Sequence, residues 1–192
     1  FVPTILTWAI VKIIKSKNQI LNTISEISLF IFFNILLSGI VTQILKHIIG
    51  RPRPVLFNGF DQKSLSIINF DSKWHSFPSG HTATIFAFIF CMILLFPKIK
   101  NILITIAIII ASTRVIVGAH FISDIFGGAL VAYLSSIFIS KNLASKKILF
   151  TTEGEKLIPN SNVNIISSYI AKVYKNIFSL YLNFNFYFKT LT

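Results

Sequence analysis

Residues 76–88 read "SFPSGHTATIFAF", a polar tetrad (Pro-Ser-Gly-His) followed at once by the start of a long apolar run. From Trp74 to Pro97 the chain contains no Asp, Glu, Lys or Arg. A bilayer core of about 30 Å is crossed by ~20 apolar helical residues, with a range of ~17–25. The stretch therefore predicts a membrane-spanning helix from His81 to about Pro97, with a histidine in its first turn.

Three further blocks without charged residues cover 27–45, 101–113 and 125–140. The last two reach the length of a span only by including Arg114 and Asp124, which places these charges near a membrane boundary. The whole chain of 192 residues is 54% hydrophobic and only 12% charged, too apolar for an ordinary soluble domain. We therefore expect an all-α fold, a polytopic bundle of transmembrane helices.

The positive charge of the chain follows the predicted topology. Many of the lysines flank the span ends that lie on one side of the membrane: Lys12, Lys15, Lys17, Lys98, Lys100, Lys141, Lys146 and Lys147. By the positive-inside rule this end faces the cytoplasm, and the long loop over about 49–77 faces outward. Membrane topology thus accounts for the net charge of +12. We expect the bilayer as a partner and no nucleic acid.

Arginine is used differently from lysine. Only three of the 18 basic residues are arginines, and Arg51, Arg53 and Arg114 all fall at outward ends of spans. The planar guanidinium group binds carboxylate or phosphate in a bidentate manner. Snorkelling to the interface is the alternative explanation, but it would be more natural at the lysine-rich end. The arginines therefore favour a site for an anion.

The topology gathers polar groups at the outward ends of four helices. They are Lys46, Arg51, Arg53, Ser79, His81, Arg114, His120 and Asp124. One carboxylate among four cations and two histidines is typical of a pocket for a multiply charged anion, such as a phosphate ester. No CxxC, HExxH or carboxylate cluster indicates a metal site, and no cofactor is expected.

The residue types within this pocket suggest separate roles. Ser79 and Gly80 predict a helix N-cap with a backbone free to approach a ligand, and helix N-termini bind phosphate. His120 and Asp124 are spaced i,i+4 on one helical face, so the carboxylate can hold one ring nitrogen and leave the other free to attack phosphorus. His81 has no such carboxylate and suits a general acid.

Three motifs carry a resemblance to a known family. "KHIIGRPRP" (46–54), "PSGH" (78–81) and "TRVIVGAHFISD" (113–124) resemble the signature of the type 2 phosphatidic acid phosphatases, the lipid phosphate phosphatases. Six residues separate Lys46 from Arg53, five separate Arg114 from His120, and three separate His120 from Asp124, as in the family. Thr113 stands where the family usually has Ser. The resemblance covers roughly residues 28 to 140.

The resemblance implies a mechanism and roles for the matching residues. His120 would be the nucleophile that forms a phosphohistidine, Asp124 would orient it, and His81 would be the acid. The phosphate would be held without a metal by Lys46, Arg53, Ser79, Gly80 and Arg114. Arg51 lies outside the strict signature and is an additional candidate contact.

The resemblance leaves the reaction and the substrate open. Hydrolysis of a membrane lipid or isoprenoid (di)phosphate is the primary expectation. Transfer of the phosphoryl group to a lipid or sugar acceptor, or a non-catalytic lipid-binding role, are the alternatives. Undecaprenyl diphosphate, phosphatidylglycerophosphate, phosphatidate and lipid A 1-phosphate all remain candidate substrates, and the oligomeric state stays open.

The chain divides into an expected phosphatase core over 1–147 and a segment over 148–192. Family members in membranes have six spans, and we count about four and a half, so the first part of the set is expected to be missing. In the second segment, "TTEGEKLIPNSN" (151–162) is expected to be a flexible linker before an amphipathic cytoplasmic helix, with a further span as the alternative. We expect the inner membrane of a bacterium, with the active site facing the periplasm.

Overall fold

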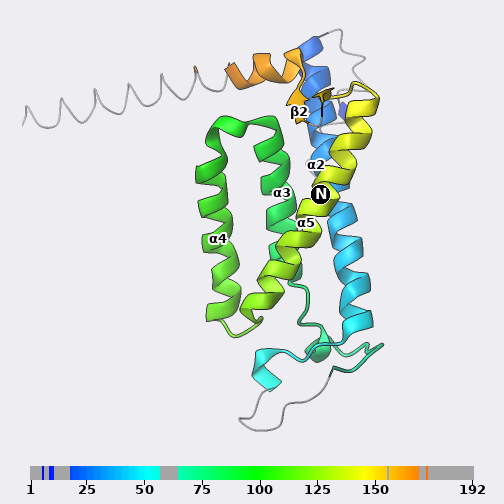
Figure 1. Ribbon diagram of the computed structural model, residues 1–192, viewed down its shortest axis with the longest axis vertical. Coiled ribbons are helices and arrows are strands. Elements are labelled where there is room, and N and C mark those ends of the chain that lie inside the picture. The colour runs from blue at the N-terminus through cyan, green and yellow to red at the C-terminus, as the bar shows by residue number, and fades with distance from the viewer. Residues whose placement is uncertain are drawn as a thin grey trace, which may run out of the picture.

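The structure is a computed structural model that describes residues 6, 9–10, 18–56, 65–154, 156–168 and 172. Its main elements, shown in Figure 1, are α2 (Gln19–Ile49), α3 (Gly80–Leu95), α4 (Lys100–Ile116), α5 (Ile122–Ser145), β1 (Phe150–Glu153) and β2 (Lys156–Pro159). Short 3-10 turns, η1 (Pro54–Leu56), η2 (Ser72–Trp74) and η3 (Pro97–Ile99), lie in the connections. The predicted helical bundle is confirmed.

The helix α3 is the central element, because it packs against α2, α4 and α5. Its buried face carries small side chains, Ala83, Ala87 and Cys91, and small residues let membrane helices approach closely. Large apolar side chains point outward instead, and Ile102 and Ile109 on α4 are each 61% exposed. This distribution suits a bundle surrounded by lipid.

Three stretches are long and apolar enough to cross a membrane: Gln19–Leu56, Pro97–Ile116 and Ile122–Ser145. They indicate an integral membrane protein. The fourth expected span, α3, has 16 residues and falls just below that length. In Figure 1 its lower end stops short of the lower ends of α2 and α4. The shorter length leaves room for polar groups at this end of the bundle.

One buried face of α2 is polar rather than apolar. Asn34, Ser38, Thr42 and Lys46 follow one another at four-residue intervals, and all four are buried. The Asn34 amide Nδ2 lies 2.8 Å from the Ala87 carbonyl and 2.8 Å from the Ser136 hydroxyl, which links α2 to both α3 and α5. Hydrogen bonds of this kind join helices in the apolar interior of a membrane.

The connection after α2 folds back over the end of that helix. Gly50 ends α2 with a positive φ of 51°, and a side chain there would meet the Ser66 carbonyl. Backbone hydrogen bonds run from Ser66 to Gly50 (2.9 Å) and from Ser76 to Arg51 (3.0 Å). The two segments flanking 57–64 therefore lie together, and they carry Arg51 to the start of α3.

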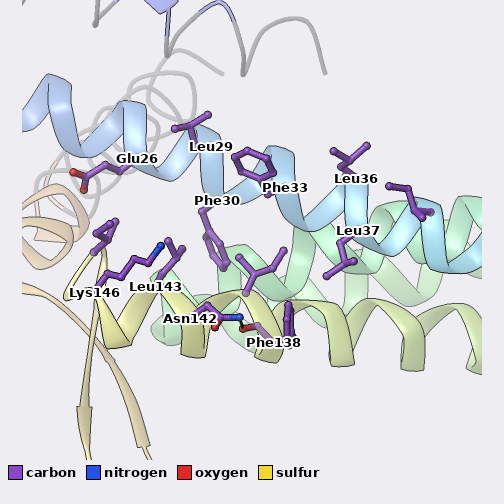
Figure 2. Close-up of a pocket in the computed structure, with 13 residues that line it drawn as sticks. Glu26, Leu29, Phe30, Phe33, Leu36, Leu37, Phe138, Asn142, Leu143 and Lys146 are labelled. Atoms are coloured by element: carbon purple, nitrogen blue, oxygen red, sulfur yellow. Dashed lines mark hydrogen bonds between the residues drawn. The ribbon is translucent and has the colours of Figure 1, made fainter.

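At the opposite end of the bundle, a hydrophobic groove runs between α2 and α5. It has a volume of about 510 Å³. We call it the apolar groove and define it by Leu29, Phe33, Leu36, Leu37, Ile40, Phe138, Ile139 and Leu143, with Glu26, Asn142 and Lys146 among its polar residues (Figure 2).

The segment expected to be a flexible linker differs from that expectation. Strands β1 and β2 form an antiparallel hairpin in which Phe150 pairs with Pro159 and Glu153 with Lys156. Phe150 is fully buried and its ring lies 5.3 Å from that of Phe30 on α2, centroid to centroid. Burial of this aromatic ring anchors the hairpin to the bundle.

Parts of the terminal predictions lie outside the described residues. The expected half-span before Lys17 falls almost entirely there, as does most of the expected amphipathic tail. Residues 161–168 are helical, which covers only the start of that tail. The division into a core over 1–147 and a cytoplasmic segment over 148–192 stays a prediction.

Candidate active site

A polar cavity of about 530 Å³ lies at the loop end of the bundle. Six of the residues predicted for the site line it: Lys46, Arg53, Gly80, His81, Arg114 and His120. They come from α2, the loop after it, α3, α4 and the turn before α5. We call this hollow the polar cavity. Segments that are far apart in the sequence thus place three cations and two histidines around one space.

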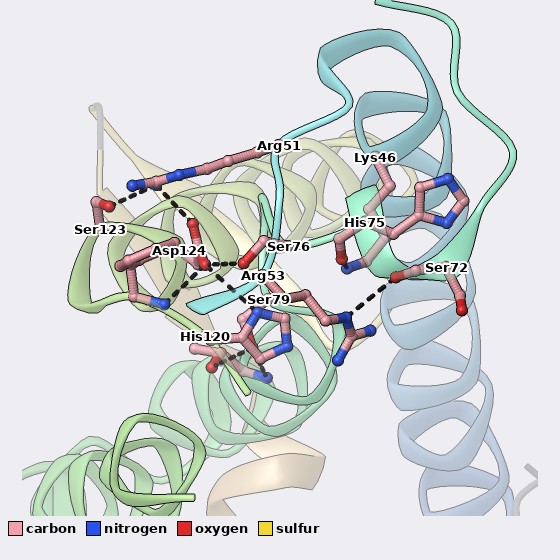
Figure 3. Close-up of polar contacts among 12 residues, drawn as sticks. Lys46, Arg51, Arg53, Ser72, His75, Ser76, Ser79, His120, Ser123 and Asp124 are labelled. Carbon is pink, nitrogen blue, oxygen red and sulfur yellow. Dashed lines mark hydrogen bonds and ion pairs between the residues drawn. The ribbon is translucent and has the colours of Figure 1, made fainter. Parts of the chain in front are cut away.

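The loop carbonyls hold two of the cations in place. The Lys46 ammonium donates to the His75 carbonyl at 2.6 Å, and Arg53 Nε donates to the Ser72 carbonyl at 3.1 Å (Figure 3). Lys46 is only 7% exposed. Cations that the protein holds in fixed positions attract an anion more strongly than mobile cations in water do.

The nucleophile predicted from the sequence, His120, is buried and stands directly before α5. Its backbone N–H donates to the Arg114 carbonyl at 3.2 Å, which ties the turn to the end of α4. Its Nδ1 lies 3.4 Å from Asp124 Oδ2. Because Nδ1 faces the carboxylate, Nε2 is the ring nitrogen available to a ligand in the polar cavity.

Asp124 is fully buried behind His120 and does not line the polar cavity. Its Oδ2 accepts a hydrogen bond from the Ser76 hydroxyl at 2.5 Å and one from the Phe121 N–H at 2.9 Å. The carboxylate is therefore held by several donors besides the histidine. This arrangement fits the orienting role that we predicted for Asp124.

Ser79 is the N-cap of α3, as the sequence predicted, and its hydroxyl lies 3.0 Å from the Thr82 hydroxyl. Its backbone N–H donates to the Asp124 carbonyl at 2.9 Å. Ser79 is fully buried and does not line the polar cavity. Ser79 therefore supports the site from behind through Thr82 and Asp124, whereas Gly80 lines the polar cavity.

His81 occupies the first turn of α3, where its side chain is exposed in the polar cavity. Arg114 lies in the last turn of α4 and faces the same space. A phosphate bound in this cavity would thus meet both His81 and His120. The arrangement fits an acid at His81 and a nucleophile at His120.

The structure does not bring Arg51 into the polar cavity. Its guanidinium group pairs with Asp124, with Nη1 2.7 Å from Oδ1. It lines a neighbouring hollow that shares only His120 with the polar cavity. The predicted contact between Arg51 and the phosphate is therefore not supported by this geometry.

Two glycines of α5 allow this helix to lie close to the start of α3 and to the loop before it. A Cβ on Gly128 would lie 2.6 Å from the Ser79 carbonyl oxygen, and one on Gly127 would lie 2.5 Å from the Phe77 ring. Real Cβ atoms do not approach other atoms so closely, and the Ser79 backbone cannot turn away as a side chain can. Gly128 therefore allows α5 to pack closely against the start of α3, and Gly127 leaves room for the Phe77 ring.

Some residues of the site were missed from the sequence. Ser76 holds Asp124, and Thr42, Gln43 and Thr84 line the polar cavity. Ser76 lies two residues before the tetrad and Gln43 three residues before Lys46. The one available signal was this closeness to the motifs. Within the described part of the chain, no group of three or more His, Cys, Asp or Glu side chains is placed to hold a metal ion.

Comparison with known proteins places this site in a family. The model of the PAP2 superfamily matches residues 28–147. The chain belongs to this superfamily, and the resemblance to the type 2 phosphatidic acid phosphatases is thereby confirmed.

Two curated relatives come from Rhizobium species, and both carry the name Lipid A 1-phosphatase. The one from Rhizobium johnstonii is 36% identical over 143 residues, which cover 74% of this chain and 58% of the relative. The one from Rhizobium etli is 37% identical over 121 residues, which cover 63% and 52%. The chain thus spans little more than half the length of either relative.

A solved structure is also similar. The crystal structure of Aquifex aeolicus LpxE matches with 29% sequence identity and a TM-score of 0.48. The match covers 60% of this chain and 68% of that one.

Proposed function

We propose that the protein hydrolyses a phosphate group from a membrane lipid, without a metal ion, through a phosphohistidine at His120. The observation that carries this proposal is the polar cavity itself, in which Lys46, Arg53 and Arg114 surround one space between His81 and His120. Phosphoryl transfer requires positioning and positive charge more than covalent chemistry from the protein. The three cations supply that charge here.

The proposed reaction has two steps. The lone pair of His120 Nε2 forms a bond to phosphorus while the bond from phosphorus to the lipid oxygen breaks, and His81 donates its proton to that oxygen. Water then forms a bond to phosphorus and gives a proton to His81, while the phosphorus–nitrogen bond breaks. The cations offset the charge on the phosphoryl oxygens, and Asp124 offsets the charge on the imidazole of His120.

The substrate that we propose is a lipid A-type glycolipid bearing a 1-phosphate. The names of the two Rhizobium relatives support this choice. Gln43 and Thr84 also line the cavity with exposed side chains, and they offer an amide and a hydroxyl group for hydrogen bonds to a substrate. Such groups suit a sugar next to the phosphate better than an isoprenoid chain, which has no hydrogen-bonding atoms.

A panel of lipids tests the proposal directly. The purified chain in detergent would be given lipid A, phosphatidate, phosphatidylglycerophosphate and undecaprenyl diphosphate, each with and without excess EDTA, and phosphate release would be measured. We expect release from lipid A at equal rates in both conditions. Loss of release on chelation, restored by Mg²⁺, would contradict the metal-free mechanism.

The same assay separates the alternative reactions. Added alcohol or sugar acceptors that take up labelled phosphate in place of water would indicate a transferase. Binding of lipid A with no product of either kind would indicate a lipid-binding protein.

We further propose that the polar cavity faces the periplasm from the inner membrane of a bacterium. The support is the lysine-rich opposite end of the bundle, with Lys98, Lys100, Lys141, Lys146 and Lys147. Reporter domains fused after Lys98 or Lys147 should report the cytoplasm, and one inserted near Asn69 should report the periplasm. The reverse pattern would place the site at the inner leaflet.

A further inference from the structure

Arg51 is the one arginine of the site that faces away from the polar cavity. Its Nη1 lies 2.7 Å from Asp124 Oδ1 and 2.7 Å from the Ser123 hydroxyl. Its Cζ lies 4.3 Å from the centroid of the Phe121 ring, within the range of a cation–π contact. Figure 3 shows Asp124 with Arg51 on one side and His120 on the other.

The contacts of Asp124 divide between its two oxygens. Oδ1 faces Arg51, while Oδ2 accepts from the Ser76 hydroxyl and the Phe121 N–H and also faces His120. The carboxylate is thus held by three donors that do not belong to the histidine. Its orientation is set before any ligand arrives.

The contact to the nucleophile is the loosest of the set. His120 Nδ1 lies 3.4 Å from Asp124 Oδ2, beyond the usual hydrogen-bond range of about 2.7–3.2 Å. Nδ1 is buried, and it has no hydrogen-bond partner among the residues that the structure describes. Catalytic hydrogen bonds are often long in the free enzyme and shorten when the ligand binds. Positive charge that develops on the ring during attack on phosphorus would draw Nδ1 towards the carboxylate.

We propose that Arg51 and Ser76 are positioning residues that hold the Asp124 carboxylate against His120, and that Arg51 does not bind the phosphate. This inference rests on the proposed function, because it assigns His120 as the nucleophile. Arg51 keeps Oδ1 occupied, so that Oδ2 is the oxygen presented to the ring. Ser76, in the loop before α3, donates its hydroxyl hydrogen to Oδ2 and so fixes that oxygen.

The inference predicts different kinetic effects for two arginines that are two residues apart. Arg53 lines the polar cavity, so loss of its charge should weaken the binding of substrate and of inorganic phosphate. Arg51 acts through Asp124, so loss of its charge should slow the chemical step and leave phosphate binding unchanged. A residue with only a structural role would not separate the two quantities in this way.

The test compares Arg51→Met with Arg53→Met in the purified full chain, using an aryl phosphate as substrate and inorganic phosphate as a competitive inhibitor. A hydrogen bond to a charged group accounts for about a 10- to 100-fold effect. We expect Arg51→Met to lower kcat by that factor with an unchanged inhibition constant, and Arg51→Lys to recover part of the loss. We expect Arg53→Met to raise KM and the inhibition constant instead.

Two further variants keep the inference testable if Arg51→Met does not fold. Ser76→Ala removes one small hydroxyl from the same carboxylate and should also lower kcat alone. In an Asp124→Asn background, either substitution should cost little more, because the group through which it acts is already changed. The inference is overturned if Arg51→Met raises the inhibition constant as Arg53→Met does, or if it lowers kcat equally in both backgrounds. A parent chain that releases no phosphate would instead refute the proposed function.

Discussion

Two hollows of nearly equal volume lie at opposite ends of the bundle, the polar cavity (about 530 Å³) and the apolar groove (about 510 Å³). Both use α2 as a wall, yet they differ completely in lining. Three cations and two histidines surround the first, whereas leucine, isoleucine and phenylalanine side chains dominate the second. Volume alone therefore does not distinguish the candidate active site from the apolar groove.

The difference comes from the distribution of polar residues along α2. Its buried polar face ends at Lys46, which lies at the polar cavity, while Leu29, Phe33 and Leu36 face the apolar groove. In a bilayer, acyl chains can cover these apolar side chains without burying a charge. The polar cavity instead carries uncompensated positive charge, which favours occupation by an anion.

The largest expected effect is at His120. His120→Ala removes the proposed nucleophile, so both turnover and the phosphoenzyme trapped with labelled substrate should disappear. Quenched-flow labelling followed by gel autoradiography measures both. Ile122→Ala is the control, because Ile122 is 64% exposed at the start of α5 and does not line the polar cavity. Labelled protein in the His120 variant would mean that another residue is the nucleophile.

A smaller and substrate-dependent effect is expected at His81. His81→Ala removes the proposed acid, and general acid catalysis is typically worth ~10²–10⁴-fold. Hydrolysis of a lipid phosphate should fall by such a factor, whereas an aryl phosphate, which has a better leaving group, should lose less. Parallel kcat measurements on the two substrates test this. An equal loss on both would indicate that His81 binds the phosphate and does not donate a proton.

The next effect concerns the packing that supports the polar cavity. Gly128→Ala places a methyl group against the Ser79 carbonyl and the Ala83 N–H, so α5 must move away from α3. Overpacking of this kind destabilises by about 1–3 kcal/mol. The melting temperature in detergent should therefore fall.

Gly39→Ala is the matched control for that substitution. Gly39 lies inside α2, and a Cβ there meets no atom of the described residues within 4 Å. Alanine is favoured over glycine in a helix by ~1 kcal/mol, so the melting temperature should hold or rise. Equal destabilisation by both substitutions would mean that an added methyl group destabilises the bundle at either position, so that the α3–α5 contact is not the cause.

The sequence predicted the residues that line the polar cavity, but it did not predict the residues that hold the Asp124 carboxylate. Lys46, Arg53, His81, Arg114 and His120 stand at motif spacings and at helix ends, so topology alone brings them together. Arg51 and Ser76 could not be assigned in the same way, because the direction of their side chains depends on how the loop folds over α2. Arg51 pairs with Asp124 while Arg53, two positions later, lines the polar cavity, and sequence spacing alone does not reveal this difference.

The hairpin at 150–159 was missed for a similar reason. Residues 151–156 are polar or glycine, a composition typical of a loop. The hairpin packs against the bundle through Phe150 and Phe30, which are 120 residues apart in the sequence, so no local pattern reveals the contact. The span lengths were predicted closely for α4 and α5, whereas α2 begins at Gln19, eight residues before its charge-free block at 27–45. The helix α3 begins at Gly80, one residue before the predicted start, and ends at Leu95, two residues before Pro97.

The smallest expected effect is in the apolar groove. Phe33 lines the groove and is 51% exposed, so Phe33→Ala removes a large ring without opening the interior of the bundle. Substitutions at exposed positions usually change free energies by no more than ~0.5 kcal/mol, which is about twofold in a rate or binding constant. We expect kcat/KM to stay within that factor for both lipid A and an aryl phosphate. A large loss with lipid A alone would show that the groove holds an acyl chain of the substrate, so that the two hollows serve one ligand. A large loss with both substrates would show that packing at the groove reaches the polar cavity along α2.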